Sequence, residues 1–339
     1  MTHSLRVLAT GPSGPPEELD PLREAGHAVT IGRPLDDPGR RPWTEAELAA
    51  AAAPADVLLA SHLETVSAAV MEAAPRLALV VVPFIGVDKV DVTAATRLGV
   101  LVANSPTREN YAAVAEAAIG LALVLLKRVK HNETRLRQGQ WSRRQDRGDF
   151  LFGKTVGLVG LGQVGRELAR RLGPWEVRLI AHDPFVDPDV ARALGVALVD
   201  LDALLATADV VTLHAALTDK NRGMIGAAAL GRMKPTAVLV NTARGELVDE
   251  AALARALAQG RLAGAALDTF AREPLPMVSP LLAADPTRLI LTPHNVSHSE
   301  AGRRANLRLA LDQILAVGRG EPPAHALNPE AIPRWRRRP

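Results

Sequence analysis

The chain alternates short apolar runs with longer segments of helical periodicity. In the first hundred residues the apolar runs have the length of buried parallel strands, and they cover residues 5–9, 28–31, 56–60, 77–82 and 100–102. These runs predict a small parallel sheet in a domain of its own. A long helical pattern follows at 111–138 and ends at Gly139, and the polar stretch 141–149 comes after it. We expect this helix to link two domains.

The second half of the chain repeats the alternation of strand and helix patterns. Strand-like runs begin at Thr155, Val177, Val210, Ala237, Ala263 and Leu289. With helical patterns between most of them, these runs predict a doubly wound parallel α/β sheet of six or more strands. A last helical segment, 300–317, follows the final run, and we expect it to cross back to the first domain.

A glycine-rich motif opens the second half. Residues 155–165 read TVGLVGLGQVG, an apolar run that meets Gly160, Gly162 and Gly165, and 166–172 has a helical pattern. Gly160 would turn the chain, Gly162 would let backbone approach a pyrophosphate, and Gly165 would let helix and strand pack closely. The pyrophosphate would then lie at the helix N-terminus. A glycine-rich turn in an ordinary βαβ unit is the structural alternative.

Asp183 ends the next apolar run, about twenty residues beyond the glycines, where the ribose hydroxyls of a dinucleotide are expected. A carboxylate at this place would repel a 2′-phosphate. The sequence therefore predicts NAD as the cofactor and disfavours NADP.

Polar residues end four later strand-like runs, namely His214, Arg244, Asp268 and His294, and Glu273 follows shortly after. The carboxyl ends of parallel strands face the ligand in an open α/β sheet. Hydride transfer to a 2-keto acid needs a cation to hold the carboxylate and polarise the carbonyl, and an imidazole to deliver the proton. A neighbouring carboxylate keeps that imidazole charged. Arg244, His294 and Glu273 supply one group of each kind.

Structural alternatives exist for these residues. An arginine before a glycine is common in surface turns, and a Glu-Pro pair, as at Glu273, is common at helix starts. His214 is either a cap or a wall of the cofactor pocket, and we expect it to contact the nucleotide. We assign His298 and Glu300 to the start of the last helix.

Composition narrows the remaining possibilities. The 339 residues contain no cysteine, so neither a disulfide framework nor a thiolate metal site is expected, and no metal is predicted. The N-terminus lacks the apolar core of a signal peptide, so we expect a cytoplasmic protein. The most apolar stretch, 112–126, is too short to span a bilayer and contains Glu116, which favours a buried or subunit-interface helix and no membrane role. The basic run 334–338 is expected to be a solvated tail, with no nucleic-acid contact.

These motifs resemble the D-isomer-specific 2-hydroxyacid dehydrogenases, a family that includes glyoxylate and hydroxypyruvate reductases, phosphoglycerate dehydrogenases and formate dehydrogenases. The resemblance covers nearly the whole chain and is carried by residues 86–91, 114–116, 160–165, 241–245, 264–270, 273–274 and 292–294. It implies a Rossmann-type doubly wound NAD domain (105–295) inserted in a smaller flavodoxin-like substrate domain (1–104 plus 296–330), followed by a basic tail (331–339). It also implies a cleft that closes around the ligand and a homodimer built on the 112–140 region.

The resemblance also implies residue roles. Arg244 would bind the substrate carboxylate and keto oxygen, His294 would be the general acid/base, and Glu273 would orient and charge it. Asp268 would hold the nicotinamide carboxamide, and backbone of the glycine turn would bind the pyrophosphate. The expected cofactor-binding residues are Gly160, Gly162, Gln163, Val164, Gly165, Asp183, His214, Ala215, Thr242, Ala243, Arg244, Asp268 and His294. The expected substrate-binding residues are Phe84, Ile85, Gly86, Arg244 and His294.

Several residues depart from the family pattern. Phe84 stands where the carboxylate-cradling loop often has a glycine, and it adds an apolar wall. Ala215 replaces a proline common after the strand-end histidine, and Tyr111 stands where a small polar residue is more usual. Trp141 resembles a tryptophan that reaches a partner's active site in glyoxylate/hydroxypyruvate reductases, with a packed linker residue as the alternative. Glu273 differs from the amide of formate dehydrogenases, and the chain is expected to lack the regulatory domain of longer phosphoglycerate dehydrogenases.

We therefore expect an NAD(H)-dependent oxidoreductase that reduces a small 2-keto acid, of glyoxylate or hydroxypyruvate size, to its D-2-hydroxy acid. An NADH-sensing, corepressor-like binding protein is one alternative, and it would bind NADH with negligible turnover. Oxidation of a non-carbon substrate such as phosphite by the same arginine, glutamate and histidine is the other.

Overall fold

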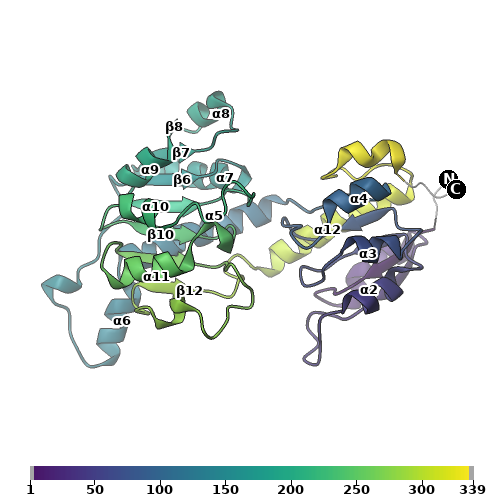
Figure 1. Cartoon of the computed structure of the whole chain (residues 1–339), viewed down its shortest axis with the longest axis horizontal. Helices are drawn as coiled ribbons and strands as arrows, with labels where there is room; N and C mark the ends of the chain where they lie inside the picture. The colour runs from purple at the N-terminus through teal and green to yellow at the C-terminus, as the bar shows by residue number, and fades with distance from the viewer. Residues whose placement is uncertain (1–3, 336–339) are drawn as a thin grey trace. The chain divides into compact units, whose positions relative to one another are not determined.

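The computed structural model describes residues 4–335, and the chain divides into two compact units (Figure 1). Unit 1 consists of Met1–Asn110 and Ser299–Pro339, and unit 2 of Tyr111–His298. These divisions lie a few residues from those expected at 104/105 and 295/296. The boundary between Asn110 and Tyr111 falls inside helix α5 (Arg108–Leu126), so the first three residues of this helix are counted in unit 1.

Unit 1 contains a five-stranded parallel sheet with the order β2-β1-β3-β4-β5. Its strands are β1 (Arg6–Ala9), β2 (Ala28–Ile31), β3 (Val57–Leu59), β4 (Leu79–Val81) and β5 (Leu101–Ala103). All five strands predicted from the apolar runs are confirmed. Because the strand order reverses between β1 and β3, a ligand crevice is expected at the carboxyl ends of these two strands.

Helices cover the two faces of this sheet. Its helical segments are η1 (Pro16–Leu19), α1 (Asp20–Glu24), α2 (Glu45–Ala52), α3 (Ala68–Glu72), α4 (Val92–Leu98), α12 (Glu300–Gly318) and η6 (Pro329–Arg334). Leu307 and Ile314 of α12 are buried in the same core as Val7 and Leu79. The last helix therefore belongs to unit 1. Glu300 starts it as expected, whereas His298 precedes it, because the Ser299 side chain caps the helix.

The expected basic tail is part of the unit 1 fold up to Trp335. Ala331 and Trp335 are buried, and the Trp335 indole N–H donates to the Ala78 carbonyl at 3.0 Å. The prediction of a solvated tail is wrong for this stretch, since the apolar Trp335 lies within the basic run and packs into the core. Residues 336–339 lie outside the described residues.

Unit 2 contains a seven-stranded parallel sheet with the order β12-β11-β10-β9-β6-β7-β8. Its strands are β6 (Thr155–Val159), β7 (Arg178–His182), β8 (Val196–Leu198), β9 (Val210–Leu213), β10 (Val238–Asn241), β11 (Gly264–Leu267) and β12 (Leu289–Leu291). The predicted α/β class and the sheet of six or more strands are confirmed. Strand β8 has no counterpart among the predicted runs, because it is short and two of its three residues are exposed.

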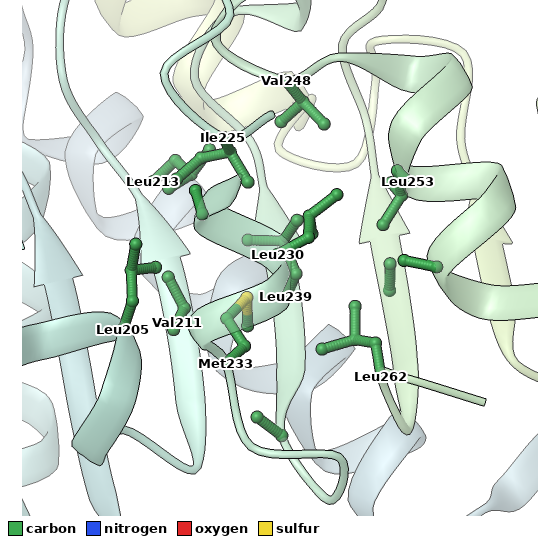
Figure 2. Close-up of a cluster of buried hydrophobic side chains, with 14 of the residues drawn as sticks. Leu205, Val211, Leu213, Ile225, Leu230, Met233, Leu239, Val248, Leu253 and Leu262 are labelled. Carbon is green, nitrogen blue, oxygen red and sulfur yellow. The ribbon is translucent and has the colours of Figure 1, made fainter. Parts of the chain in front are cut away.

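Helices pack on both faces of the unit 2 sheet, whereas α6 (Val129–Arg137) has no buried residue. The other helical segments of the unit are α5, α7 (Gln163–Leu172), α8 (Pro188–Ala193), α9 (Leu201–Thr207), α10 (Ala227–Arg232) and α11 (Glu250–Ala258), with short helical turns η2 (Arg144–Asp146), η3 (Gly173–Trp175), η4 (Gly245–Leu247) and η5 (Pro280–Ala283). Figure 2 shows one core, in which Leu230 and Met233 of the α10 region and Leu253 of α11 meet Val211 and Leu239 of the sheet. This packing holds the strand ends described below.

The helix predicted at 111–138 is two helices, α5 and α6. Arg128 breaks the pattern with a left-handed backbone, φ 52°. Helix α5 has 19 residues and is the one helix within residues 4–335 that is long and apolar enough to cross a membrane, so the expectation that it is too short is wrong. Its side chains Ala115, Leu121 and Leu125 lie in the core of unit 2, which favours a core helix over a membrane span.

Candidate active site

The glycine turn between β6 and α7 has the close contacts that its sequence predicts. Gly160 has φ 96°, and a Cβ there would lie 2.7 Å from the Ala215 nitrogen; a Cβ on Gly165 would lie 2.3 Å from the Gly160 carbonyl oxygen. Neither position has room for a side chain. By contrast, a Cβ on Gly162 would meet nothing within 4 Å. Helix α7 begins at Gln163, earlier than the expected 166, so its N-terminus opens beside Gly162.

Asp183 lies against the same turn. Its Oδ2 accepts the Leu161 N–H at 2.8 Å, and its Oδ1 accepts the Phe185 N–H at 2.9 Å. The carboxylate is thus held just after the end of β7 and beside the glycine turn. This is the arrangement in which an acid can bind ribose hydroxyls while a phosphate is bound at the helix N-terminus.

His214 follows β9 and also lies beside the turn, since its N–H donates to the Val159 carbonyl at 2.7 Å. Burial of the ring lowers the pKa of His214 to about 4. Its Nε2 lies 3.0 Å from the Thr212 hydroxyl oxygen. A histidine that stays neutral at physiological pH is a wall or a hydrogen-bonding group rather than a proton donor.

The Arg244 loop after β10 is closed by Asn241, which sequence reasoning did not single out. The Asn241 amide donates to the Arg244 carbonyl at 2.8 Å and accepts the Ala243 N–H at 3.0 Å. A Cβ on Gly245 would lie 1.9 Å from the Phe270 carbonyl carbon, so the Arg244 loop contacts the loop after β11 backbone to backbone. The sequence feature that could have identified Asn241 is a short polar residue at the end of an apolar, strand-like run.

One side chain in this loop has an unused hydrogen-bonding group. Within residues 4–335 the buried Thr242 hydroxyl has no hydrogen-bond partner. A buried hydroxyl without a partner costs free energy, and a polar ligand group would satisfy it. This fits the expectation that Thr242 contacts the cofactor.

His294 and Glu273 form the pair expected from the sequence. His294 Nδ1 and Glu273 Oε2 are 2.9 Å apart, and Glu273 Oε1 accepts the Phe270 N–H at 3.0 Å. The hydrogen bond to Glu273 raises the pKa of His294 more than burial lowers it. Burial acts to raise the pKa of Glu273, but the bonds from His294 and Phe270 lower it overall. Both groups of the pair therefore stay charged, as an imidazolium and a carboxylate, over a wider pH range than the same two groups would if they were apart.

Asp268 anchors the loop that carries His294. It is buried, and its Oδ1 accepts the Thr292 hydroxyl at 2.6 Å and the N–H groups of Asn295 and Val296 at 3.0 and 3.2 Å. His294 lies within this anchored loop at φ 51°, a left-handed conformation that needs such support. A positioning function for Asp268 was not among the sequence-based expectations.

In unit 1 the loop Phe84–Gly86 is held by hydrogen bonds to its carbonyl groups. The Phe84 carbonyl accepts the Ser105 N–H at 2.9 Å, and the Ile85 carbonyl accepts the Asn104 amide at 2.8 Å. No hydrogen bond to the N–H groups of Ile85 or Gly86 is present within the described chain. Two adjacent free N–H groups can bind a carboxylate.

Two residues singled out in the sequence lie in unit 2. Trp141 is 80% exposed, so the alternative of a packed linker residue is wrong. Tyr111 is half-buried, and burial raises its pKa. Among residues 4–335, no group of three or more histidine, aspartate or glutamate side chains could hold a metal ion.

Comparison with known proteins decides the family. Residues 119–296 match the model of the D-isomer specific 2-hydroxyacid dehydrogenase, NAD binding domain. The chain is 36% identical over 281 residues to a glyoxylate reductase of Korarchaeum cryptofilum, which covers 82% of this chain and 84% of that protein. The chain belongs to the D-isomer-specific 2-hydroxyacid dehydrogenase family.

Two further proteins are similar to this chain over most of its length. A crystal structure of a protein from Thermus thermophilus has a TM-score of 0.84 and 34% identity, and it covers 95% of this chain and 100% of that one. A D-3-phosphoglycerate dehydrogenase of Methanocaldococcus jannaschii is 38% identical over 291 residues, which are 86% of this chain and 55% of that protein. The chain thus spans about half the length of the curated phosphoglycerate dehydrogenases that it matches.

The family match assigns the cofactor domain. The glycine turn, Asp183, Arg244, Glu273 and His294 all lie within the matched NAD-binding domain. The open N-terminus of α7 and the carboxylate beside it fit the pyrophosphate and ribose of that cofactor. NAD(H) is therefore the cofactor of this dehydrogenase family member.

Proposed function

We propose that this chain is a dehydrogenase that interconverts a small 2-keto acid and its D-2-hydroxy acid with NAD(H). The observation that carries the proposal is the His294–Glu273 pair, 2.9 Å apart, in a unit that binds NAD. Arg244 lies at the end of β10 in the same sheet, next to the β11 loop that carries Glu273. These are the cation, the imidazole and the carboxylate that the reaction needs.

When bound in unit 2, NAD(H) would supply or accept the hydride, and the residues of this chain would hold and protonate the substrate. Arg244 binds the substrate carboxylate and polarises the keto oxygen by hydrogen bonding. His294 donates a proton from Nε2 to that oxygen during reduction, while its Nδ1 stays bonded to Glu273. Because Glu273 raises the pKa of His294, more of the donor form is present at a given pH than in a histidine without this partner. In the oxidative direction neutral His294 takes the hydroxyl proton.

We assign the remaining contacts as the sequence suggests. Phe84, Ile85 and Gly86 contact the substrate, with the free N–H groups of the loop directed at a carboxylate oxygen. The cofactor contacts are Gly160, Gly162, Gln163, Val164, Gly165, Asp183, His214, Ala215, Thr242, Ala243, Arg244, Asp268 and His294. Asp183 favours NADH over NADPH, since its carboxylate would face a 2′-phosphate.

We also propose a homodimer built on the 112–140 region. Val129, Leu136 and Trp141 are exposed apolar side chains in or beside it. An interface between proteins commonly buries exposed apolar side chains of this kind. Trp141 would lie against the partner subunit, in keeping with its exposure. Sedimentation velocity tests this assembly, with Trp141→Ala as the variant expected to weaken it.

A substrate panel tests the activity. Purified protein is mixed with NADH or NADPH and with glyoxylate, hydroxypyruvate, pyruvate, phenylpyruvate or phosphohydroxypyruvate, and the absorbance at 340 nm is followed. Saturable NADH oxidation with a short 2-keto acid, slower with NADPH, supports the proposal. Tight NADH binding without turnover of any of them would support a binding protein instead.

A further inference from the structure

Asn241 ends β10, a strand that pairs with β9 on one side and β11 on the other, and its side chain is fully buried. Its Nδ2 donates to the Arg244 carbonyl at 2.8 Å, and its Oδ1 accepts the Ala243 N–H at 3.0 Å. A buried amide is favourable when both its donor and its acceptor are used, and these two bonds fix its orientation. The Arg244 loop is therefore tied to the end of a central strand.

The Arg244 side chain is folded against the same loop. Its Nη1 donates to the Ala243 carbonyl at 2.8 Å. Ala243 thus connects two side chains, because its N–H is bonded to the Asn241 amide and its carbonyl to the Arg244 guanidinium. A displacement of Ala243 would carry the guanidinium with it.

The other side of the loop contacts the residue that holds Glu273. A Cβ on Gly245 would lie 1.9 Å from the Phe270 carbonyl carbon, and the Phe270 N–H donates to Glu273 Oε1 at 3.0 Å. Glu273 is in turn the partner of His294. The Arg244 loop is thus held by close backbone contact on the side of the His294–Glu273 pair and by Asn241 on the side of the strand.

The main chain of Asn241 has a separate bond to the loop region of His294. Its carbonyl accepts the Asp268 N–H at 3.0 Å, and Asp268 Oδ1 accepts the N–H groups of Asn295 and Val296 beside His294. A substitution of the Asn241 side chain leaves this backbone bond in place. Such a variant therefore acts on the Arg244 part of the site.

We propose that Asn241 is a positioning residue for the reaction, whose side-chain amide sets the place of the Arg244 guanidinium relative to the His294–Glu273 pair. The inference rests on the function proposed above, in which Arg244 binds the substrate carboxylate, and it adds a residue that acts through Arg244. A displaced guanidinium binds the carboxylate less well, so the loss of this amide should raise the KM for the 2-keto acid.

Two substitutions of Asn241 test the proposal. Asn241→Ala removes both side-chain bonds, whereas Asn241→Asp keeps the size of the side chain and replaces the NH2 group that donates to the Arg244 carbonyl by an oxygen. The Arg244 carbonyl also accepts the Leu247 N–H at 3.3 Å, so neither variant leaves this carbonyl without a partner.

Asn328 in unit 1 is the matched control. It is also fully buried, its Nδ2 donates to the Val100 carbonyl at 2.9 Å and to the Thr96 hydroxyl at 3.1 Å, and its Oδ1 accepts the Val102 N–H at 2.9 Å. Asn328→Ala therefore removes the same kind of buried amide from the other unit. A merely structural effect lowers the fraction of folded enzyme, and with it the apparent kcat, but leaves the KM of the folded fraction unchanged.

The experiment measures KM and kcat at saturating NADH with the 2-keto acid that the wild type turns over fastest. We expect both Asn241 variants to raise KM by about tenfold or more and Asn328→Ala to keep KM within about twofold of wild type. A KM within about twofold of wild type in either Asn241 variant, or an equal rise in Asn328→Ala, would overturn the positioning role alone. Failure of the wild type to turn over any 2-keto acid would overturn the proposed function before the variants are compared.

Discussion

Replacement of Glu273 by glutamine removes the negative charge of the side chain and keeps its size and position, so the effect of the charge can be measured alone. In the structure Glu273 Oε1 accepts the Phe270 N–H and Oε2 faces His294 Nδ1. A glutamine of the same shape must keep its oxygen on the Phe270 N–H, so its NH2 group would face Nδ1. That arrangement suits a neutral imidazole and opposes the imidazolium. We therefore expect Glu273→Gln to lower the pKa of His294 without moving the loop.

The size of the effect follows from the geometry of the pair. A hydrogen bond between charged groups contributes about 1.5–3 kcal/mol. The side chains of His294 and Glu273 are 49% and 38% exposed, so solvent screening places this pair near the lower end, at about 1.5 kcal/mol. This free energy corresponds to about a tenfold change in the population of the imidazolium, and so in the rate of reduction.

The assay is the pH dependence of kcat/KM for reduction of a 2-keto acid by NADH. Above the pKa of His294 the variant should be about tenfold slower than wild type. At low pH, where His294 is protonated in both proteins, the rates should converge to within about twofold. Glu250→Gln is the matched control. The Glu250 carboxylate accepts the N–H of Ala271, which lies in the same loop as Glu273, at 2.8 Å. Glu250 is not part of the His294–Glu273 pair, so its replacement should leave the pH dependence unchanged. If kcat/KM of Glu273→Gln decreases at the same high pH as kcat/KM of the wild type, the reasoning is refuted.

Three further predictions concern stability. Gly245→Ala should lower the melting temperature by many degrees, because its Cβ would lie 1.9 Å from Phe270 backbone; an unchanged melting curve would contradict the close approach. Thr269→Val should raise the free energy of unfolding in urea by about 1 kcal/mol, since the buried Thr269 hydroxyl has no partner among residues 4–335, and a loss would contradict this. Burial lowers the pKa of His27, so the protein should lose stability as the pH falls below 6.5, the ordinary value. A His27→Gln variant should show a flatter dependence of unfolding free energy on pH between about 7.5 and about 5, and an identical slope would exclude His27 as the cause.

The apolar runs were enough to predict most strands of both sheets. Parallel strands buried on both faces produce continuous apolar runs, and the polar residues after them must lie at one edge. This is why His214, Arg244, Asp268 and His294 could be assigned to strand ends from the sequence alone. Strand β8 was not predicted, because it has only three residues and two of them are exposed.

The features that sequence reasoning missed depend on tertiary contacts. The break between α5 and α6 at Arg128 interrupts a pattern that is otherwise helical on both sides. The burial of Trp335 depends on its contact with Ala78, far away in the sequence. Asn241 and Asp268 hold the loops of Arg244 and His294 through hydrogen bonds to backbone, and such bonds leave no periodic signal in the sequence.

The central claim is that His294 delivers a proton during NADH-dependent reduction of a short 2-keto acid. The most direct test compares the wild type with His294→Asn, following NADH oxidation at 340 nm with pyruvate or hydroxypyruvate and NADH binding by nicotinamide fluorescence. We predict that both proteins bind NADH and that the variant, even when saturated with NADH, turns over at least about 100-fold more slowly. Equal turnover by the two proteins would contradict the claim.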